Sequence, residues 1–128
     1  MSEKTQLRKE INMNKTLEIA IKALDSKKAV EISALEVGSL TIVADYFVIA
    51  AGSSTTQVRA LADEVEYQLG LEGIEPRQIE GKSTGWILLD YYDVVIHVFL
   101  QDQREYYNLE KLWADSEPLD ISSLITEE

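Results

Sequence analysis

The spacing of apolar residues predicts alternating helices and strands along the first half of the chain. From residue 17 to residue 24, apolar side chains recur at spacings of three and four, which predicts an amphipathic helix capped by Asn14. Residues 29–37 alternate between apolar and polar side chains, as expected of a strand. Residues 46–51, YFVIAA, are too few to cross a membrane and rich in strand formers, so they predict a central strand buried on both faces.

A turn at Gly52 and Ser53 separates this strand from a second predicted helix. Ser54 and Gln57 have the spacing of a capping box, and apolar positions from residue 58 to residue 69 form one inward stripe. Such a turn could also cradle a phosphate group, because free amide groups at a helix N-terminus attract anions. The glycine patterns of Walker and Rossmann loops are missing, so a tight turn with a capping serine is the favoured interpretation.

The second half of the chain predicts three strands and a last helix. Residues 77–80 predict a short strand. Residues 86–90 (WILLD) and 94–100 (VVIHVFL) predict two strands, joined most simply as an antiparallel hairpin through residues 91–93. Aromatic and leucine side chains share one side of a short helix predicted over residues 105–113. This order predicts an α/β fold in which a mixed β-sheet is flanked by helices.

The length of 128 residues suits one compact domain. We expect a polar N-terminal arm over residues 1–13, a single domain over residues 14–114, and a flexible acidic tail over residues 115–128, frayed beyond Pro118. The arm has no continuous apolar stretch, so it predicts neither a secretory signal nor a membrane anchor. Its acidic residues also differ from a transit peptide, which favours the bacterial cytoplasm over an organelle.

The chain is strongly acidic, with 12 Lys and Arg against 23 Asp and Glu and a formal net charge of −11 at pH 7. A surface of this sign repels phosphate backbones, so we expect little direct contact with nucleic acid. A basic protein is the natural partner, since opposite electrostatic fields speed encounter and oppose wrong partners. There is no cysteine and only one histidine, which excludes sulfur-based zinc sites and multi-histidine sites, and we predict no metal or cofactor.

The residue patterns argue against catalysis. Asp90 and Asp93 are the nearest candidates for a magnesium-binding pair, but they flank a predicted turn, where polar residues are common without a metal. Serine hydrolysis would require a GxSxG elbow, which is missing. His97 lies inside an apolar strand, where a structural histidine is more common than a catalytic base. We therefore predict no catalytic residue.

Aromatic side chains favour protein binding instead. Trp86, the Tyr91-Tyr92 pair and the Tyr106-Tyr107 pair belong to the core in the simplest interpretation of each. However, strands near the C-terminus of a small domain can leave one sheet face uncovered. Trp, Tyr and Leu beside carboxylates are usual components of an interface hot spot. An aromatic centre with an acidic rim favours a protein-binding face over an active site.

Four segments follow one another in an order typical of a known family. They are DYFVIAAGSSTTQVRALADEV from Asp45, IEG from Ile79, WILLDYYDVVIHVF from Trp86 and REYYNLEKLW from Arg104. In this order they resemble the ribosomal silencing factor S family, also called the Iojap family. The resemblance runs from the first helix to Trp113 and leaves out the arm and the tail. Departures are small: Ala51 stands where many relatives have threonine, and Tyr92 stands where glycine is common, so Tyr92 must accept the backbone angles of that turn.

This resemblance implies a nucleotidyltransferase-like fold without enzymatic activity. Family members bind a large-subunit ribosomal protein that forms an intersubunit bridge, so the small subunit cannot join and translation falls when nutrients are scarce. Carried onto this chain, the family's contact region gives the candidate partner-binding residues Trp86, Leu88, Asp90, Tyr91, Asp93 and Arg104. A homodimer of the free protein is a further expectation from the family.

Two other functions stay open beside repression. One is a large-subunit assembly factor that uses the same binding face. The other is a nucleotide-binding protein with a residual nucleotidyltransferase-like site at the turn formed by Gly52 and Ser53.

Overall fold

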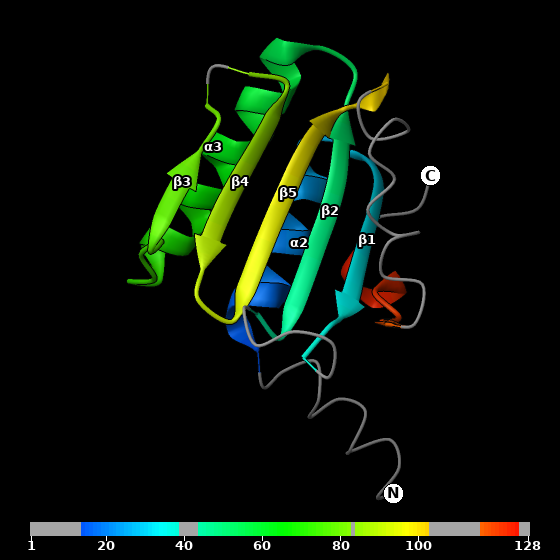
Figure 1. The fold of residues 1–128 in the computed structure, drawn as a ribbon, viewed down its shortest axis with the longest axis vertical. Coiled ribbons are helices and arrows are strands. Elements are labelled where there is room, and N and C mark those ends of the chain that lie inside the picture. The colour runs from blue at the N-terminus through cyan, green and yellow to red at the C-terminus, as the bar shows by residue number, and fades with distance from the viewer. Residues whose placement is uncertain (1–13, 39–43, 83, 103–115, 126–128) are drawn as a thin grey trace, which may run out of the picture.

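One sheet and two helices form the fold in the computed structural model, which describes residues 14–38, 44–82, 84–102 and 116–125. The sheet has the strand order β3-β4-β5-β2-β1-β6, and α2 and α3 both lie behind one face of it (Figure 1). The elements are α2 (Lys15–Ser26), β1 (Val30–Glu36), β2 (Tyr46–Gly52), α3 (Thr55–Leu71), β3 (Gln78–Glu80), β4 (Trp86–Tyr91), β5 (Val94–Leu100), β6 (Glu117–Pro118) and the 3-10 helix η1 (Ser122–Leu124). The predicted α/β fold with a mixed sheet is confirmed.

The two central strands form the only parallel pair among the described strands. β2 runs parallel to β5 with Ile49 opposite His97, and the remaining neighbours are antiparallel. Nearly every position of both strands is buried, as the apolar run 46–51 predicted. β4 and β5 form the predicted hairpin, in which Tyr91 pairs with Val94 across a two-residue turn.

Side-chain caps begin both helices where the sequence predicts them. Asn14 accepts a hydrogen bond from the Leu17 amide at 2.9 Å, and the Ser54 hydroxyl accepts one from the Gln57 amide at 3.1 Å. The Gln57 side chain reaches back, but to Ser53, whose amide donates to Gln57 Oε1 at 2.6 Å. Each cap satisfies a backbone donor that has no partner within its own helix.

The helix-side core lies between the two helices and one face of the sheet. Each buried side chain there removes apolar surface from water, which is the main favourable contribution to folding. The buried members are Leu17, Ala20, Ile21, Ala23 and Leu24 of α2, Val58, Leu61, Ala62, Val65 and Leu69 of α3, and Ala34, Val48, Ala50, Ile87, Leu89, Tyr91, Val94, Ile96 and Val98 of the strands.

The described part of the acidic tail packs against the domain. β6 pairs with the end of β1, where Leu35 lies opposite Pro118, and the Leu119 amide donates to the Ala34 carbonyl at 2.9 Å. Four apolar side chains beyond β6 pack on the helix-side core, namely Leu119, Ile121, Leu124 and Ile125. Residues 116–125 therefore differ from the expected flexible tail, because backbone pairing and apolar burial hold them to β1.

Several predicted segments lie outside the described residues. They are the whole N-terminal arm over residues 1–13, the helix over residues 105–113, and residues 115 and 126–128 of the tail. In the described parts of the chain, no helix is long and apolar enough to span a membrane.

Candidate partner-binding face

The alternation of β4 divides its side chains between the two faces of the sheet. Ile87, Leu89 and Tyr91 belong to the helix-side core, so Trp86, Leu88 and Asp90 point to the opposite face. We call this opposite side the second face. The antiparallel register places Trp86 opposite Phe99, Leu88 opposite His97 and Asp90 opposite Val95 on β5.

An aromatic cluster of four rings occupies the centre of the second face. The rings of Trp86 and Phe99 lie with centroids 4.9 Å apart, and Phe47 meets His97 edge to face at 4.9 Å. His97 and Phe99 are stacked at 6.0 Å with 7° between their planes. Trp86 and Leu88 are half-buried and pack against a smaller apolar cluster that includes Phe47 and Phe99. The cluster therefore combines buried rings with a tryptophan that keeps part of its surface in water.

His97 is a buried, neutral histidine within this cluster. Its Nδ1 accepts a hydrogen bond from the Trp86 indole Nε1 at 3.3 Å. Its Nε2 is buried without a hydrogen-bond partner among the described residues. Burial lowers the pKa of His97 to about 4, since an apolar environment disfavours the charged form. The structural role predicted for His97 agrees with these contacts.

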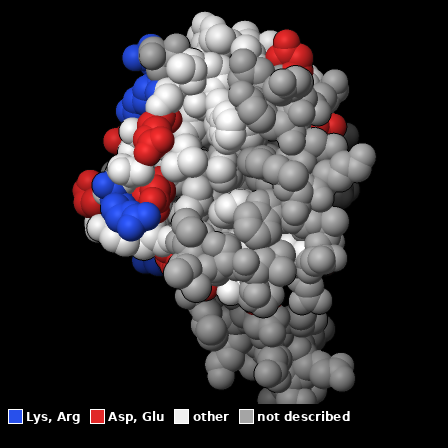
Figure 2. All heavy atoms as spheres, viewed as in Figure 1, with Lys and Arg blue, Asp and Glu red and all other residues white. Residues whose placement is uncertain are grey.

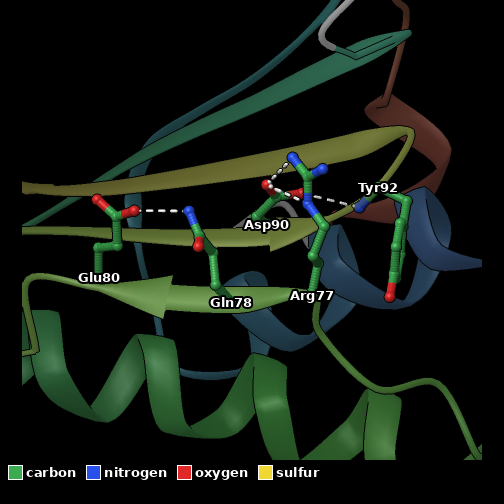
Figure 3. A network of polar contacts seen from close by, with 5 residues as sticks. All are labelled: Arg77, Gln78, Glu80, Asp90 and Tyr92. Carbon is green, nitrogen blue, oxygen red and sulfur yellow. Dashed lines mark hydrogen bonds and ion pairs between the residues drawn. The ribbon is translucent and has the colours of Figure 1, made fainter.

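A strip of polar residues runs along β3 and β4 beside the aromatic cluster (Figure 3). Arg77 donates from Nη2 and Nε to Asp90 Oδ2, at 2.6 and 3.1 Å, and the Tyr92 amide donates to Asp90 Oδ1 at 2.9 Å. The Asp90 hydrogen bond raises the pKa of Arg77. The guanidinium also lies 5.8 Å from the centre of the Tyr92 ring. Asp90 is only 4% exposed, so Arg77 supplies the positive charge that a buried carboxylate requires.

An open hollow of about 280 Å³ lies next to this strip, lined by Glu80, Gly81, Trp86 and Leu88. Gly81 has φ +81°, and a Cβ there would clash with the Trp86 carbonyl oxygen, so only glycine fits. The Glu80 carboxylate accepts a hydrogen bond from the Gln78 side-chain amide at 2.6 Å. Figure 2 shows acidic and basic side chains gathered over the β3 side of this face, with uncharged residues beside them. The hollow is thus part apolar and part acidic.

Of the six predicted contact residues, the structure brings three together and places Tyr91 and Asp93 elsewhere. Trp86, Leu88 and Asp90 share the second face, whereas Tyr91 is 2% exposed within the helix-side core, where burial raises its pKa to about 12. Exposed Asp93 lies in the hairpin turn and accepts from the Asn14 side-chain amide at 2.9 Å. Arg104 lies outside the described residues.

Arg77, Glu80 and His97 are additions that sequence reasoning did not place at this face. For the residues of β3, the signal was the alternation of residues 77–80, because Gln78 pairs with Asp90 and Glu80 with Leu88. Without the partner strand of this short segment, that register could not be assigned.

The alternative catalytic residues are engaged in contacts within the chain. Asp90 binds Arg77, and Asp93 binds Asn14, so the two carboxylates serve different structural contacts. No group of three possible metal ligands occurs in the described ranges. At the other candidate site, Gln57 Oε1 accepts from the amide and the hydroxyl of Ser53, at 2.6 and 2.9 Å. An anion at this turn would have to displace that side chain.

The fold and this face define a small α/β domain in which helices cover one side of a mixed sheet and the other side carries a half-exposed tryptophan in an aromatic cluster. Residues 10–128 match the family model described as "Ribosomal silencing factor during starvation". The chain belongs to this family of ribosomal silencing factors. The match extends beyond Trp113, so it includes the tail that the sequence motifs left out.

Individual relatives agree with the family. The chain is 45% identical over 112 residues to ribosomal silencing factor RsfS of Bacillus subtilis, covering 87% of this chain and 95% of that protein. A crystal structure from Chromobacterium violaceum has a TM-score of 0.75 and 38% identity, and covers 77% of this chain and 83% of the other.

Relatives from eukaryotes match as well. The chain is 31% identical over 100 residues to protein Iojap, chloroplastic, of Zea mays, which covers 78% of this chain and 44% of that protein. It is also 32% identical over 101 residues to "Mitochondrial assembly of ribosomal large subunit protein 1" of Mus musculus, covering 76% of this chain and 44% of that protein.

Proposed function

We propose that this protein represses translation by docking through its second face on the large ribosomal subunit. The bound protein occupies the side that faces the small subunit, so the two subunits do not join. Membership of the ribosomal silencing factor family supports a ribosomal target. The choice of the large subunit is supported by the name of the mouse relative. The observation that carries the choice of surface is the half-exposed Trp86 beside the hollow at Glu80.

The proposed partner is a basic large-subunit ribosomal protein. The chain has a net charge of −11, and its second face combines Trp86 and Leu88 with the carboxylate of Glu80. Tryptophan is enriched among hot-spot residues, and a complementary charge at the rim speeds association. The proposed contact is therefore an apolar centre with an acidic edge, and direct contact with ribosomal RNA is minor.

The proposed mechanism is steric and includes no covalent step. We place its action in the bacterial cytoplasm, in line with the long matches to bacterial relatives. A large-subunit assembly factor is the second candidate, because the mouse relative is named for that role. Subunit profiles separate the two, since an assembly factor affects large-subunit maturation during growth whereas a repressor lowers subunit joining in starvation. The nucleotidyltransferase-like character of the fold and a homodimer of the free protein stay predictions.

Co-sedimentation with isolated large subunits tests the proposed face. Trp86→Ala removes the central ring and should weaken binding by roughly 30-fold, the loss typical of a hot-spot residue. Tyr67→Ala is the matched control, because Tyr67 is 59% exposed on α3, on the helix side. This control should bind like the wild type. Full binding by a folded Trp86→Ala variant would show that the face is wrongly assigned.

A charge reversal tests the same face without removing a packed ring. Glu80 is exposed, so Glu80→Lys should leave the fold intact and weaken docking on a basic partner. Glu72→Lys makes the same charge change at the C-terminal end of α3 and should have little effect. Equal binding by both variants would contradict the proposed charge complementarity.

A further inference from the structure

We propose that His97 is a positioning residue for docking: its Nδ1 holds the indole N–H of Trp86 and sets the orientation in which the ring meets the partner. The inference rests on the proposed function, because it assigns a role at the same face. It adds a residue that does not itself contact the partner but acts through Trp86.

Two contacts with described residues limit the orientation of the indole. Trp86 stands at the start of β4, opposite Phe99, and their ring centroids lie 4.9 Å apart, which limits the tilt of the indole plane. The indole has a single polar atom, a donor, and this atom points to His97 Nδ1 at 3.3 Å. Rotation of the ring about its side-chain bonds would break this hydrogen bond. Packing and hydrogen bonding together select one orientation.

His97 is itself held firmly enough to act as a fixed acceptor. It is 6% exposed, with Phe47 edge-on at 4.9 Å and Phe99 parallel at 6.0 Å. A ring enclosed in this way has little rotational freedom. An accepting Nδ1 places the proton of the neutral imidazole on Nε2. Burial lowers the pKa of His97 to about 4, so Nδ1 keeps its lone pair at neutral pH.

A fixed indole favours docking for a general reason. An interface side chain that must be ordered on binding loses conformational freedom, and this loss weakens the complex. Trp86 is half-buried, so a rotated ring would also present a different surface to the partner. If the Trp86 ring is already ordered before the encounter, this loss of conformational freedom on binding is avoided. The hydrogen bond that Trp86 donates to His97 therefore increases affinity without any contact between His97 and the partner.

Nitrogen-15 NMR of the free protein tests the positioning contact directly. The chain has one histidine and two tryptophans, so the imidazole signals need no assignment and a Trp86→Phe spectrum identifies the indole signal. We expect an unprotonated Nδ1, a protonated Nε2 and slow solvent exchange of the Trp86 indole proton. His97→Asn, which retains an acceptor near Nδ1, should preserve slow exchange, whereas His97→Phe should abolish it. The opposite tautomer, or fast exchange in the wild type, overturns the inference.

A double-mutant cycle tests the consequence for docking. His97→Phe keeps a ring but removes the acceptor, and should weaken co-sedimentation with large subunits by about 3- to 10-fold, the value of one hydrogen bond. Trp86→Phe removes the donor, so adding His97→Phe to it should cause no further loss. If His97 were only structural, His97→Phe would instead cause the same loss of binding in the wild type and in the Trp86→Phe background.

The outcomes separate the inference from the proposed function. Wild-type binding together with equal binding by His97→Phe overturns the positioning role and leaves the docking face in place. Equal losses from His97→Phe in the wild-type and Trp86→Phe backgrounds do the same. Absence of wild-type binding overturns the proposed function, and the positioning role with it.

Discussion

Acidification should destabilise this protein through its single histidine. In the folded state burial lowers the pKa of His97 to about 4, whereas an unfolded chain has a histidine pKa of about 6.5. As the pH falls below 6.5 the unfolded state therefore binds a proton that the folded state does not. The stabilisation of the folded state that comes from the neutral imidazole is fully present above about pH 6.5. It is lost progressively as the pH falls to about 4.

The pKa of His97 is about 4 in the folded state and about 6.5 in the unfolded state. At about 1.4 kcal/mol for each pH unit, this difference contributes about 3 kcal/mol to the free energy of unfolding. Urea unfolding of the wild type and His97→Phe at pH 7 and pH 4.5 measures it. The stability difference between the two proteins should change by about 2.5 kcal/mol in favour of the variant at pH 4.5. Carboxylates titrate in both proteins, so this subtraction isolates His97. Parallel pH profiles would refute a buried, neutral imidazole.

Substitutions at three further positions, with one compensating change, test contacts around the hairpin turn. Tyr92 has φ +73°, so Tyr92→Gly should be about 1 kcal/mol more stable to thermal unfolding than Tyr92→Ala, and the reverse order would contradict the left-handed turn. Asn14→Ala removes a helix cap and the contact with Asp93 and should cost about 1–2 kcal/mol in urea unfolding; an unchanged midpoint would count against both. Arg77→Ala leaves the Asp90 carboxylate without its ion pair and should lower Tm. Adding Asp90→Asn should restore part of the loss, and a further drop would argue against an uncompensated charge.

Signals within a few residues of one another were sufficient to predict the helix starts and the hairpin. Asn14 and Ser54 identified both helix starts, because a capping side chain acts on an amide only three residues away. The hairpin followed from two apolar runs around a short turn. Tyr92 accepts positive φ, as its position in place of a common glycine required.

Features that depend on distant partners could not be assigned in the same way. Alternation separates Tyr91 from Trp86, but which side the helices cover depends on the register of the whole sheet. The pair formed by Arg77 and Asp90 joins two strands, and the length of β3 gave little information on its partner. In the tail, the acidic composition obscured the apolar residues that pack on the domain, such as Leu119.

Subunit joining in the presence of this protein tests the central claim most directly. Purified large and small subunits are mixed with an excess of the wild type or of Trp86→Ala, and joined ribosomes are measured by light scattering and on sucrose gradients. The wild type should reduce the joined fraction, and the variant should restore it. Equal joining with and without the wild type would contradict repression by occlusion of the large subunit.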